Sequence, residues 1–113
     1  MSSQHAELSK RHCTPIESGT PALPDEVVKR LLGTLPGWQC KDREINKTFT
    51  FDNYYKTMAF VNAAAWVSHR EDHHPDMEVG YNKCTVRYST HSVGGLSEND
   101  FIAAAKMESL FAL

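Results

Sequence analysis

The sequence predicts an α+β domain in which three helices cover one face of a four-stranded antiparallel sheet, in the order α-β-β-α-β-β-α. Two observations support this prediction. Segments with apolar residues at helical spacing alternate with pairs of segments in which every second residue is apolar. Within each pair a short polar turn separates the two segments, as in a β-hairpin, so the sheet is expected to be antiparallel. Each strand then has one apolar face that helices can cover.

The chain of 113 residues, 41% of them hydrophobic, is long enough for one domain with one core and too short for two. Its formal net charge of -2 gives no electrostatic support for nucleic-acid or anionic-membrane binding. No segment approaches the roughly 18 apolar residues of a membrane span, and the first residues lack the apolar stretch of a secretion signal. We therefore expect no direct nucleic-acid partner, no membrane insertion and no secretion.

The cysteines indicate a cellular compartment. Cys13, Cys40 and Cys84 are odd in number, widely spaced and free of any C-x-x-C pair. This pattern argues against a disulfide framework and against a thiolate zinc site. A cytoplasmic location, where thiols stay reduced, is the simplest setting for such a chain.

Residues 1–22 are polar, include two prolines and a glycine, and show no apolar period. We interpret them as an N-terminal arm that is either mobile or laid over the surface. Its histidines, His5 and His12, are expected to be solvated. Residues 23–113 then form the single domain.

The domain begins with a predicted helix. Asp25 and Glu26 suit a first turn, Gly33 suits the end, and the apolar face between them comprises Val27, Val28, Leu31 and Leu32. The helix is therefore expected over about residues 25–32.

The first hairpin follows Pro36-Gly37. Residues 38–41 are expected to pair with residues 45–51 across the charged turn Asp42-Arg43, and one face of the hairpin should be buried. Lys47 interrupts the apolar side of the second strand. We interpret it as a strand end at the margin of the sheet.

A long second helix should start at Asp52 or Asn53, either of which can cap it. Apolar residues then recur at helical spacing and should form the face that packs on the sheet: Tyr54, Met58, Val61 and Ala65, widened by Phe60, Ala64 and Val67. A ligand-binding role for these aromatic residues is the less favoured alternative.

The second hairpin pairs two alternating runs, and the third helix follows it. Met77, Val79 and Tyr81 form the apolar side of one strand, Asn82-Lys83 turns the chain, and the return strand carries Cys84, Val86 and Tyr88. Beyond a Gly-Gly pair, Ser97 suits an N-cap, Asp100 completes a capping box, and Leu96 with Phe101 forms a hydrophobic staple. The helix that starts here has a buried side running to Phe111.

Three histidines, His69, His73 and His74, cluster before Pro75 at the expected end of the second helix, and His91 follows the last strand. A residue before proline is disfavoured in a helix, so His74 should lie where the helix gives way to a loop. An unperturbed imidazole titrates near pH 6.5, so such a cluster suits general acid/base chemistry.

Two alternatives compete with catalysis. His69 and His73 stand four residues apart, which is metal-ligand spacing on a helix. However, the zinc-protease patterns require Glu where this chain has Arg70, or Glu where it has Asp72. We therefore expect no metal. The structural alternative is that histidines cap the helix C-terminus, where a protonated imidazole is favoured, but this accounts for one histidine rather than the cluster.

Four short segments carry a resemblance to a known family: His73-His74-Pro75, Tyr81-Asn82-Lys83, Ser89-Thr90-His91, and Gly95-Leu96-Ser97-Glu98 followed by Asp100. Over residues 24–113 the chain resembles the pterin-4a-carbinolamine dehydratases, also called 4a-hydroxytetrahydrobiopterin dehydratases. The resemblance implies the same sheet-and-helix fold, a tetramer, and neither metal nor cofactor. It also implies a pterin substrate, dehydration of 4a-hydroxytetrahydropterin to quinonoid dihydropterin, and an indirect link to phenylalanine hydroxylase, whose pterin cofactor this hydro-lyase reaction recycles.

The resemblance assigns site residues. His73, His74 and His91 match the family's three active-site histidines, and we expect His73 and His91 to form the acid/base pair while His74 binds and orients the substrate. Ser89 and Thr90 match a strand end whose backbone contacts the pterin.

Asp100 matches the closing acid of the family signature and is assigned to substrate binding, with its capping role as an equal alternative. At His69 the chain departs from animal members, which often carry Glu there. All three active-site histidines should lie at element ends, where their loss costs at most about 1 kcal/mol of stability.

Two further expectations concern partners. Because one sheet face and the strand edges lack covering elements, we expect a homo-oligomer, either a dimer or a tetramer. Animal relatives also act as dimerisation cofactors of a homeodomain transcription factor, so a regulatory role through protein binding is the alternative function. Binding of that kind would survive loss of the histidines, whereas catalysis would not.

Overall fold

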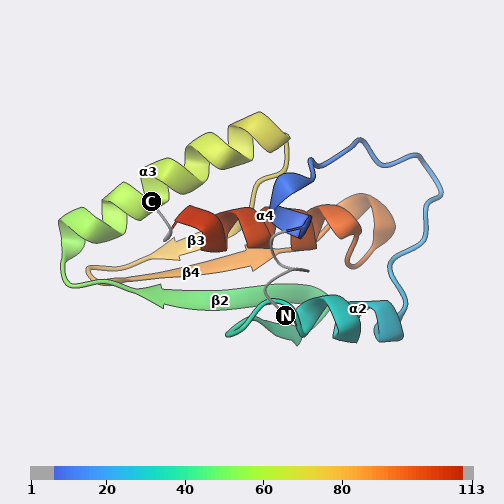
Figure 1. The fold of residues 1–113 in the computed structure, drawn as a ribbon, viewed down its shortest axis with the longest axis horizontal. Coiled ribbons are helices and arrows are strands. Elements are labelled where there is room, and N and C mark those ends of the chain that lie inside the picture. Colours follow the sequence, from blue (N-terminus) through green and yellow to red (C-terminus); the bar gives the residue numbers. More distant parts are fainter. Residues whose placement is uncertain (1–6, 111–113) are drawn as a thin grey trace.

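The computed structural model describes residues 7–110 and confirms the α+β class and the element order (Figure 1). His5 and Phe111, discussed above, lie outside these residues. The helices are α2 (Asp25–Leu32), α3 (Tyr54–Glu71) and α4 (Glu98–Ser109), and the strands are β1 (Gln39–Lys41), β2 (Glu44–Thr50), β3 (Asp76–Val79) and β4 (Lys83–Tyr88). Two short features were not predicted: a helical turn at residues 7–10 and the 3₁₀ helix η1 (His91–Val93).

The four strands form one antiparallel sheet in the order β1-β2-β4-β3. Asp42 and Arg43 both have positive φ, 52° and 65°, which is the backbone of a type I′ hairpin turn. The turn of the second hairpin comprises residues 80–82 and not the predicted Asn82-Lys83, because β3 ends at Val79 and β4 begins at Lys83. Tyr81 consequently lies in the turn and is exposed.

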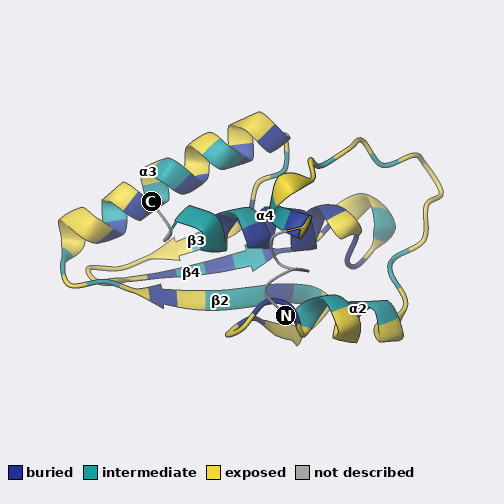
Figure 2. Cartoon of the chain, in the orientation of Figure 1, coloured by how far each residue is buried: buried dark blue, intermediate teal, exposed yellow. Residues whose placement is uncertain are grey.

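The core lies between one sheet face and the helices. Phe101 to Ala105 of α4 are buried without interruption, so this helix is enclosed on almost all sides, and its three alanines let its neighbours approach closely (Figure 2). On the sheet side the core comprises Ile45, Phe49, Cys84, Val86 and Tyr88. All three cysteines of the chain are free thiols.

The opposite sheet face is polar. The hydroxyls of Thr48 and Thr85 share a hydrogen bond at 2.8 Å across β2 and β4. Arg87 pairs with Glu78 at 3.0 Å and with Glu44 at 3.5 Å. This face is therefore suited to water, and the prediction of an oligomer gains no support from it.

Lys47 is not at a strand end, contrary to the prediction. It sits opposite Val86 in the middle of β2, one of the two central strands. Its ammonium group forms an ion pair with Glu108 of α4, which also accepts a hydrogen bond from Trp38 Nε1 at 2.9 Å. The ammonium group is tolerated on the core side of the sheet because the Glu108 carboxylate neutralises its charge there.

The buried face of α3 is rotated from the predicted stripe. Its buried residues include Thr57, Phe60, Ala64 and Ser68, whereas Tyr54 and Ala65 are exposed. The small polar residues can be buried because their hydroxyls are satisfied locally: Thr57 donates to the Asn53 and Tyr81 carbonyls, and Ser68 to the Ala64 carbonyl. Counting apolar residues alone misses such a face.

The arm, residues 7–22 in the described part, runs over the surface beside α4 and the end of α3 (blue in Figure 1). Leu8 is buried in the core cluster, Lys106 donates to the Ser9 carbonyl at 2.7 Å, and Arg11 pairs with Glu98 at 3.0 Å. Among the described helices, none combines the length and apolar character needed to cross a bilayer.

Candidate active site

The end of α3 sets the direction of the histidine segment. Asp72 follows the helix in the left-handed conformation, with φ 51°. Its N–H donates to the His69 carbonyl and the His73 N–H donates to the Ser68 carbonyl, which together form a Schellman motif. The helix therefore ends before His73, so His69 and His73 do not share a helical face and the spacing argument for a metal fails.

His73 is held firmly. Its Nε2 lies 2.7 Å from Asp100 Oδ1, and its ring stacks on Tyr88 with centroids 5.6 Å apart and an interplanar angle of 7°. Only 14% of its side chain is exposed. The expectation that all three histidines would be dispensable for stability is therefore revised for His73, because its loss would leave a buried carboxylate without one of its partners.

Asp100 serves two purposes. One carboxylate oxygen accepts from the Ser97 N–H at 2.9 Å and from the Thr90 hydroxyl at 2.8 Å, while the other faces His73. The residue is fully buried, and Thr90 and Ser97 share a further hydrogen bond at 2.7 Å. Because donors surround the carboxylate, it acts as an acceptor and His73 Nε2 donates to it; in the neutral imidazole this leaves Nδ1 as an acceptor.

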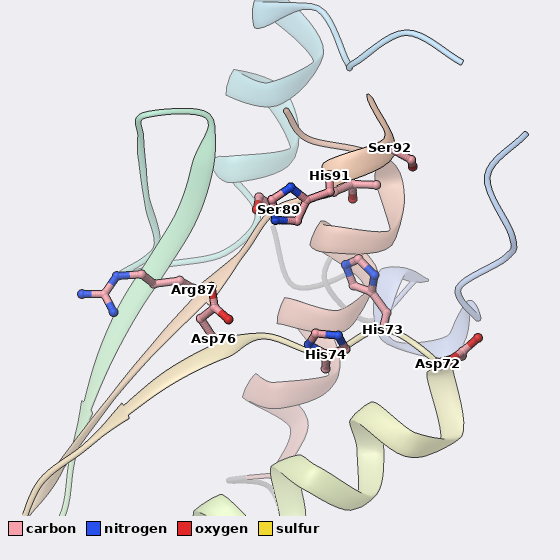
Figure 3. A pocket seen from close by; sticks show the side chains of 9 residues that line it. Asp72, His73, His74, Asp76, Arg87, Ser89, His91 and Ser92 are labelled. Carbon is pink, nitrogen blue, oxygen red and sulfur yellow. The ribbon is translucent and has the colours of Figure 1, made fainter. Parts of the chain in front are cut away.

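A cavity of about 340 Å³, the histidine cavity, opens beside this pair. Of the residues predicted for the site, it is lined by His73, His74, Ser89, Thr90 and His91 (Figure 3). They come from two segments: the loop after α3, and the end of β4 with η1. The structure thus brings together His73 and His91, which are 18 positions apart in the chain.

The residues of the histidine cavity differ in exposure. His74, Ser89 and His91 are exposed, and their side chains have no hydrogen-bond partner among the described residues. Thr90 is buried, and its N–H donates to the Gly95 carbonyl at 2.8 Å. Of the two strand-end residues, Ser89 is therefore the one whose backbone is better placed for a ligand. Asp100 lies behind His73 and does not line the cavity.

Arg87 also lines the cavity, but Figure 3 shows its side chain pointing away from the histidines, consistent with its pairing to Glu44 and Glu78. His69 is exposed and lines a different cavity at the end of α3. Within residues 7–110 the structure contains no cluster of three His, Cys, Asp or Glu side chains able to hold a metal ion.

Three residues with roles around His73 were missed from the sequence. Tyr88 was expected only as an apolar strand residue, yet it supports the imidazole; burial raises its pKa, so its hydroxyl stays protonated. Glu71 and Asn99 hold the arm against the ends of α3 and α4. A Glu inside a charged run and an Asn in a helix first turn give no sequence signal of burial.

Glu71 is a buried carboxylate with several donors around it. Burial alone would raise its pKa, but the Cys13 N–H at 2.8 Å and His12 Nδ1 at 2.9 Å, with the Lys106 ammonium at 3.8 Å, outweigh burial and hold the pKa below its usual value. The burial of Cys13, together with the negative charge of Glu71, raises the pKa of its thiol to about 12. The thiol is thus a packing group at neutral pH.

A buried carboxylate bonded to one histidine, with two further histidines around the same cavity, gives a small α+β domain a cavity in the size range of small-molecule sites and side chains of the kind that transfer protons. The comparison with known families agrees. The chain belongs to the pterin 4 alpha carbinolamine dehydratase family, whose model matches residues 21–110.

Bacterial relatives match nearly the whole chain. A protein of Nitrosomonas eutropha is 61% identical over 105 residues, covering 92% of this chain and 93% of its own. A protein of Nitrosospira multiformis is 56% identical over 107 residues, covering 95% of each. Both carry names that assign them provisionally as pterin-4-alpha-carbinolamine dehydratases.

Two solved structures are similar. A transcriptional coactivator/pterin dehydratase from Brucella melitensis superposes with a TM-score of 0.76 at 32% identity, covering 79% of this chain and 97% of that one. A pterin dehydratase-like protein described as a RuBisCO assembly factor of the alpha-carboxysome gives 0.55 at 26% identity, covering 65% and 84%. The fold is therefore found in proteins described by different roles.

Proposed function

We propose that this chain dehydrates 4a-hydroxytetrahydropterin to quinonoid dihydropterin by histidine acid/base catalysis, the recycling step that keeps aromatic amino-acid hydroxylases supplied with pterin. Family membership supports the reaction class. The observation that carries the proposal is the His73–Asp100 pair beside a cavity shared with His74 and His91.

The reaction needs two proton transfers. A proton reaches the hydroxyl oxygen on C4a, the C4a–O bond breaks and water leaves; the proton on N5 is removed, and its electron pair forms the C4a–N5 double bond. His73, with Nε2 bonded to Asp100, has Nδ1 free to accept, so we assign it as the base. We assign His91 as the acid and His74, with Ser89, to holding the ring.

The cavity suits such a substrate in size. A volume of about 340 Å³ falls in the range of small-molecule sites and can enclose a fused bicyclic ring. Thr90 and the Asp100 carboxylate hold the cavity wall by hydrogen bonds that do not depend on a ligand. The base is thus positioned before the substrate arrives.

The experiment is a direct rate measurement. The purified protein, mixed with a synthetic 4a-carbinolamine, should accelerate its dehydration over the buffer rate, with the same kcat before and after exhaustive chelation. An unchanged dehydration rate would refute the proposed activity. Stoichiometric zinc together with activity abolished by chelation would refute the metal-free chemistry.

We also propose a homo-oligomer, with the outer face of α3 as its contact. Tyr55 and Trp66, 80% and 61% exposed, lie on one side of the helix with Ala59 and Asn62 between them. Aromatic residues around a small-residue stripe fit a second helix of the same kind. Light scattering should give a dimer or tetramer for the wild type and a smaller species for Trp66→Glu; a wild-type monomer at micromolar concentration would contradict this.

The same exposed aromatic residues favour a second candidate function, protein binding in a regulatory role. The solved relatives described as a coactivator and as an assembly factor show that the fold occurs in proteins with such roles. The two functions are separable, because replacement of His73 and His91 by Ala should abolish dehydration and leave a protein partner bound. Cytoplasmic activity remains part of the proposal and rests on the free thiols.

A further inference from the structure

A second cavity, which we call the arm chamber, adjoins the histidine cavity. Its volume is about 290 Å³, and the four arm residues Cys13 to Ile16 form one wall. The opposite wall includes Glu71 and Asn99. His73, Asp72, Thr90 and Ser92 line both cavities, so the arm chamber begins where the histidine cavity ends. Figure 3 shows three of these shared residues, Asp72, His73 and Ser92, from the side of the histidine cavity.

The arm is fixed at the chamber by its backbone. Asn99 accepts from the Thr14 N–H at 3.1 Å and donates to the Thr14 carbonyl at 2.8 Å, so its amide pairs with both backbone groups of one residue, as a neighbouring strand would. The Cys13 N–H donates to Glu71 at 2.8 Å. Because both side chains are buried, these bonds hold the register of the arm better than exposed contacts would.

The residues that hold the arm are sequence neighbours of those that hold the base. Glu71 ends α3 two positions before His73, and Asn99 directly precedes Asp100. The wall of the arm chamber and the catalytic histidine are therefore built on the same two helix ends. A ligand group bound in the arm chamber would therefore lie next to His73.

The chemistry of the proposed substrate indicates which group this is. C4a, N5 and C6 are consecutive ring atoms, so the reacting atoms and the substituent on C6 lie on one edge of the pterin. If His73 removes the N5 proton, the C6 substituent projects past His73. Thr14, Ser92 and Asn99 provide hydroxyl and amide groups there, while Pro15 and Ile16 are apolar. Such a lining suits a short hydroxylated carbon chain.

We propose that the arm is part of the substrate site and that the arm chamber receives the C6 side chain of the pterin, so that Cys13 to Ile16 select among pterins by this group. The proposal rests on the proposed dehydration for the orientation of the ring. It assigns residues 13–16 a role in specificity rather than in proton transfer.

The test compares two carbinolamines, one with a methyl group and one with a 1,2-dihydroxypropyl group on C6. Ile16→Trp, which fills the chamber, should lower kcat/KM for the dihydroxypropyl compound at least about 10-fold more than for the methyl compound. Ser18→Trp places a tryptophan on an exposed arm residue outside both cavities. It should leave the ratio of the two kcat/KM values unchanged. Equal losses for both substrates with Ile16→Trp would overturn the proposal.

A second variant releases the arm without filling the chamber. Thr14→Pro removes the N–H that binds Asn99, and Ser18→Pro is its matched control. Release should reduce the preference of the wild type between the two substituents, whereas the control should retain it. Retained preference in Thr14→Pro would count against the proposal.

Binding separates this proposal from the proposed function. Stable 7,8-dihydropterins with the same two C6 groups can be titrated calorimetrically, so the chamber is tested even if no carbinolamine is dehydrated. Suppose that no carbinolamine is dehydrated, but that the Kd depends on the C6 group in the wild type and not in Ile16→Trp. This result would refute the proposed dehydration and support the role of the chamber. A Kd independent of the substituent would refute the chamber, whatever the rates.

Discussion

The two sides of the histidine cavity are built differently. On one side His73 is stacked on Tyr88 and bonded to a fully buried carboxylate. In the rest of its lining, His91 of η1 and His74 beside His73 are exposed, and in residues 7–110 neither ring has a hydrogen-bond partner. The difference teaches that one of the two histidines proposed for proton transfer is positioned by the fold, whereas the other is free of side-chain hydrogen bonds within the described residues. Changes on the two sides should therefore have separable effects on turnover and on stability.

The largest expected effect is on turnover. His73→Ala and His91→Ala should each lower kcat by about 10²-fold or more, since each removes one of the two groups proposed to transfer protons. Stability should distinguish them: His73→Ala is expected to cost about 1 to 3 kcal/mol because it strips a partner from buried Asp100, whereas His91→Ala should stay within about 0.5 kcal/mol. Urea titration with dehydration rates on the same samples checks both. Equal losses of stability in the two variants would show that His73 is held no more firmly than His91.

Asp100→Asn tests how His73 is held without removing a histidine. The amide cannot accept from His73, Thr90 and Ser97 as the carboxylate does, so kcat should fall about 10-fold and stability by about 1 to 3 kcal/mol. Glu98→Gln is the matched control in the same helix turn, because Glu98 pairs with Arg11 at an exposed site. Urea titrations and initial rates of both variants provide the measurement. If Asp100→Asn matched its control, Asp100 would not be orienting the base.

His74 sharpens the comparison on the exposed side. Its proposed role is to bind the substrate, and its ring has no hydrogen-bond partner among the described residues, so its loss should affect substrate affinity more than chemistry. His74→Ala is expected to raise KM several-fold with a smaller loss in kcat and no change in unfolding free energy beyond about 0.5 kcal/mol. A saturation curve for each protein measures this. A larger fall in kcat than rise in KM would place His74 in proton transfer instead.

The sequence predicted the fold well because its signals are local. Alternation identified both hairpins, and the capping box at Ser97 and Asp100 located the start of α4. Two predictions failed: the place of Lys47 in the sheet and the buried face of α3. Apolar periodicity shows neither, because Lys47 depends on a partner 61 residues away in the chain, Glu108, and the α3 face is built on hydroxyls that bond to backbone carbonyls.

The candidate site was predictable in part for the same reason. The histidines and the residues around them stand in short motifs, so the resemblance located them. The tyrosine under His73 and the Asp100 hydrogen bond to its ring depend on how β4 and α4 pack, and only the structure shows them. The arm contacts of Glu71 and Asn99 span more than 50 residues of sequence.

A smaller effect, on the pH dependence of stability, is expected at Glu71, which binds the arm two positions before His73. The folded pKa of Glu71 lies below its usual value, so its carboxylate contributes stability at pH values above about 4.5, and this contribution is lost as the pH falls through the folded pKa. Its neighbours are His12, the Cys13 N–H and Lys106. The difference in Tm between wild type and Glu71→Gln should therefore be constant near neutral pH and shrink in acid. A difference that grew as the pH fell below about 4.5, where the carboxylate itself takes up its proton, would contradict the assigned contacts.

The most direct test of the central claim, that a fixed His73 and an adjustable His91 act as one acid/base unit, is a double-mutant cycle on kcat. Dehydration rates of a synthetic carbinolamine are measured for the wild type, His73→Ala, His91→Ala and the double variant. Residues that act in one proton-transfer step should be strongly non-additive, so the loss in the double variant should fall well short of the product of the single losses. A loss equal to that product, or single variants with near-normal turnover, would contradict the account.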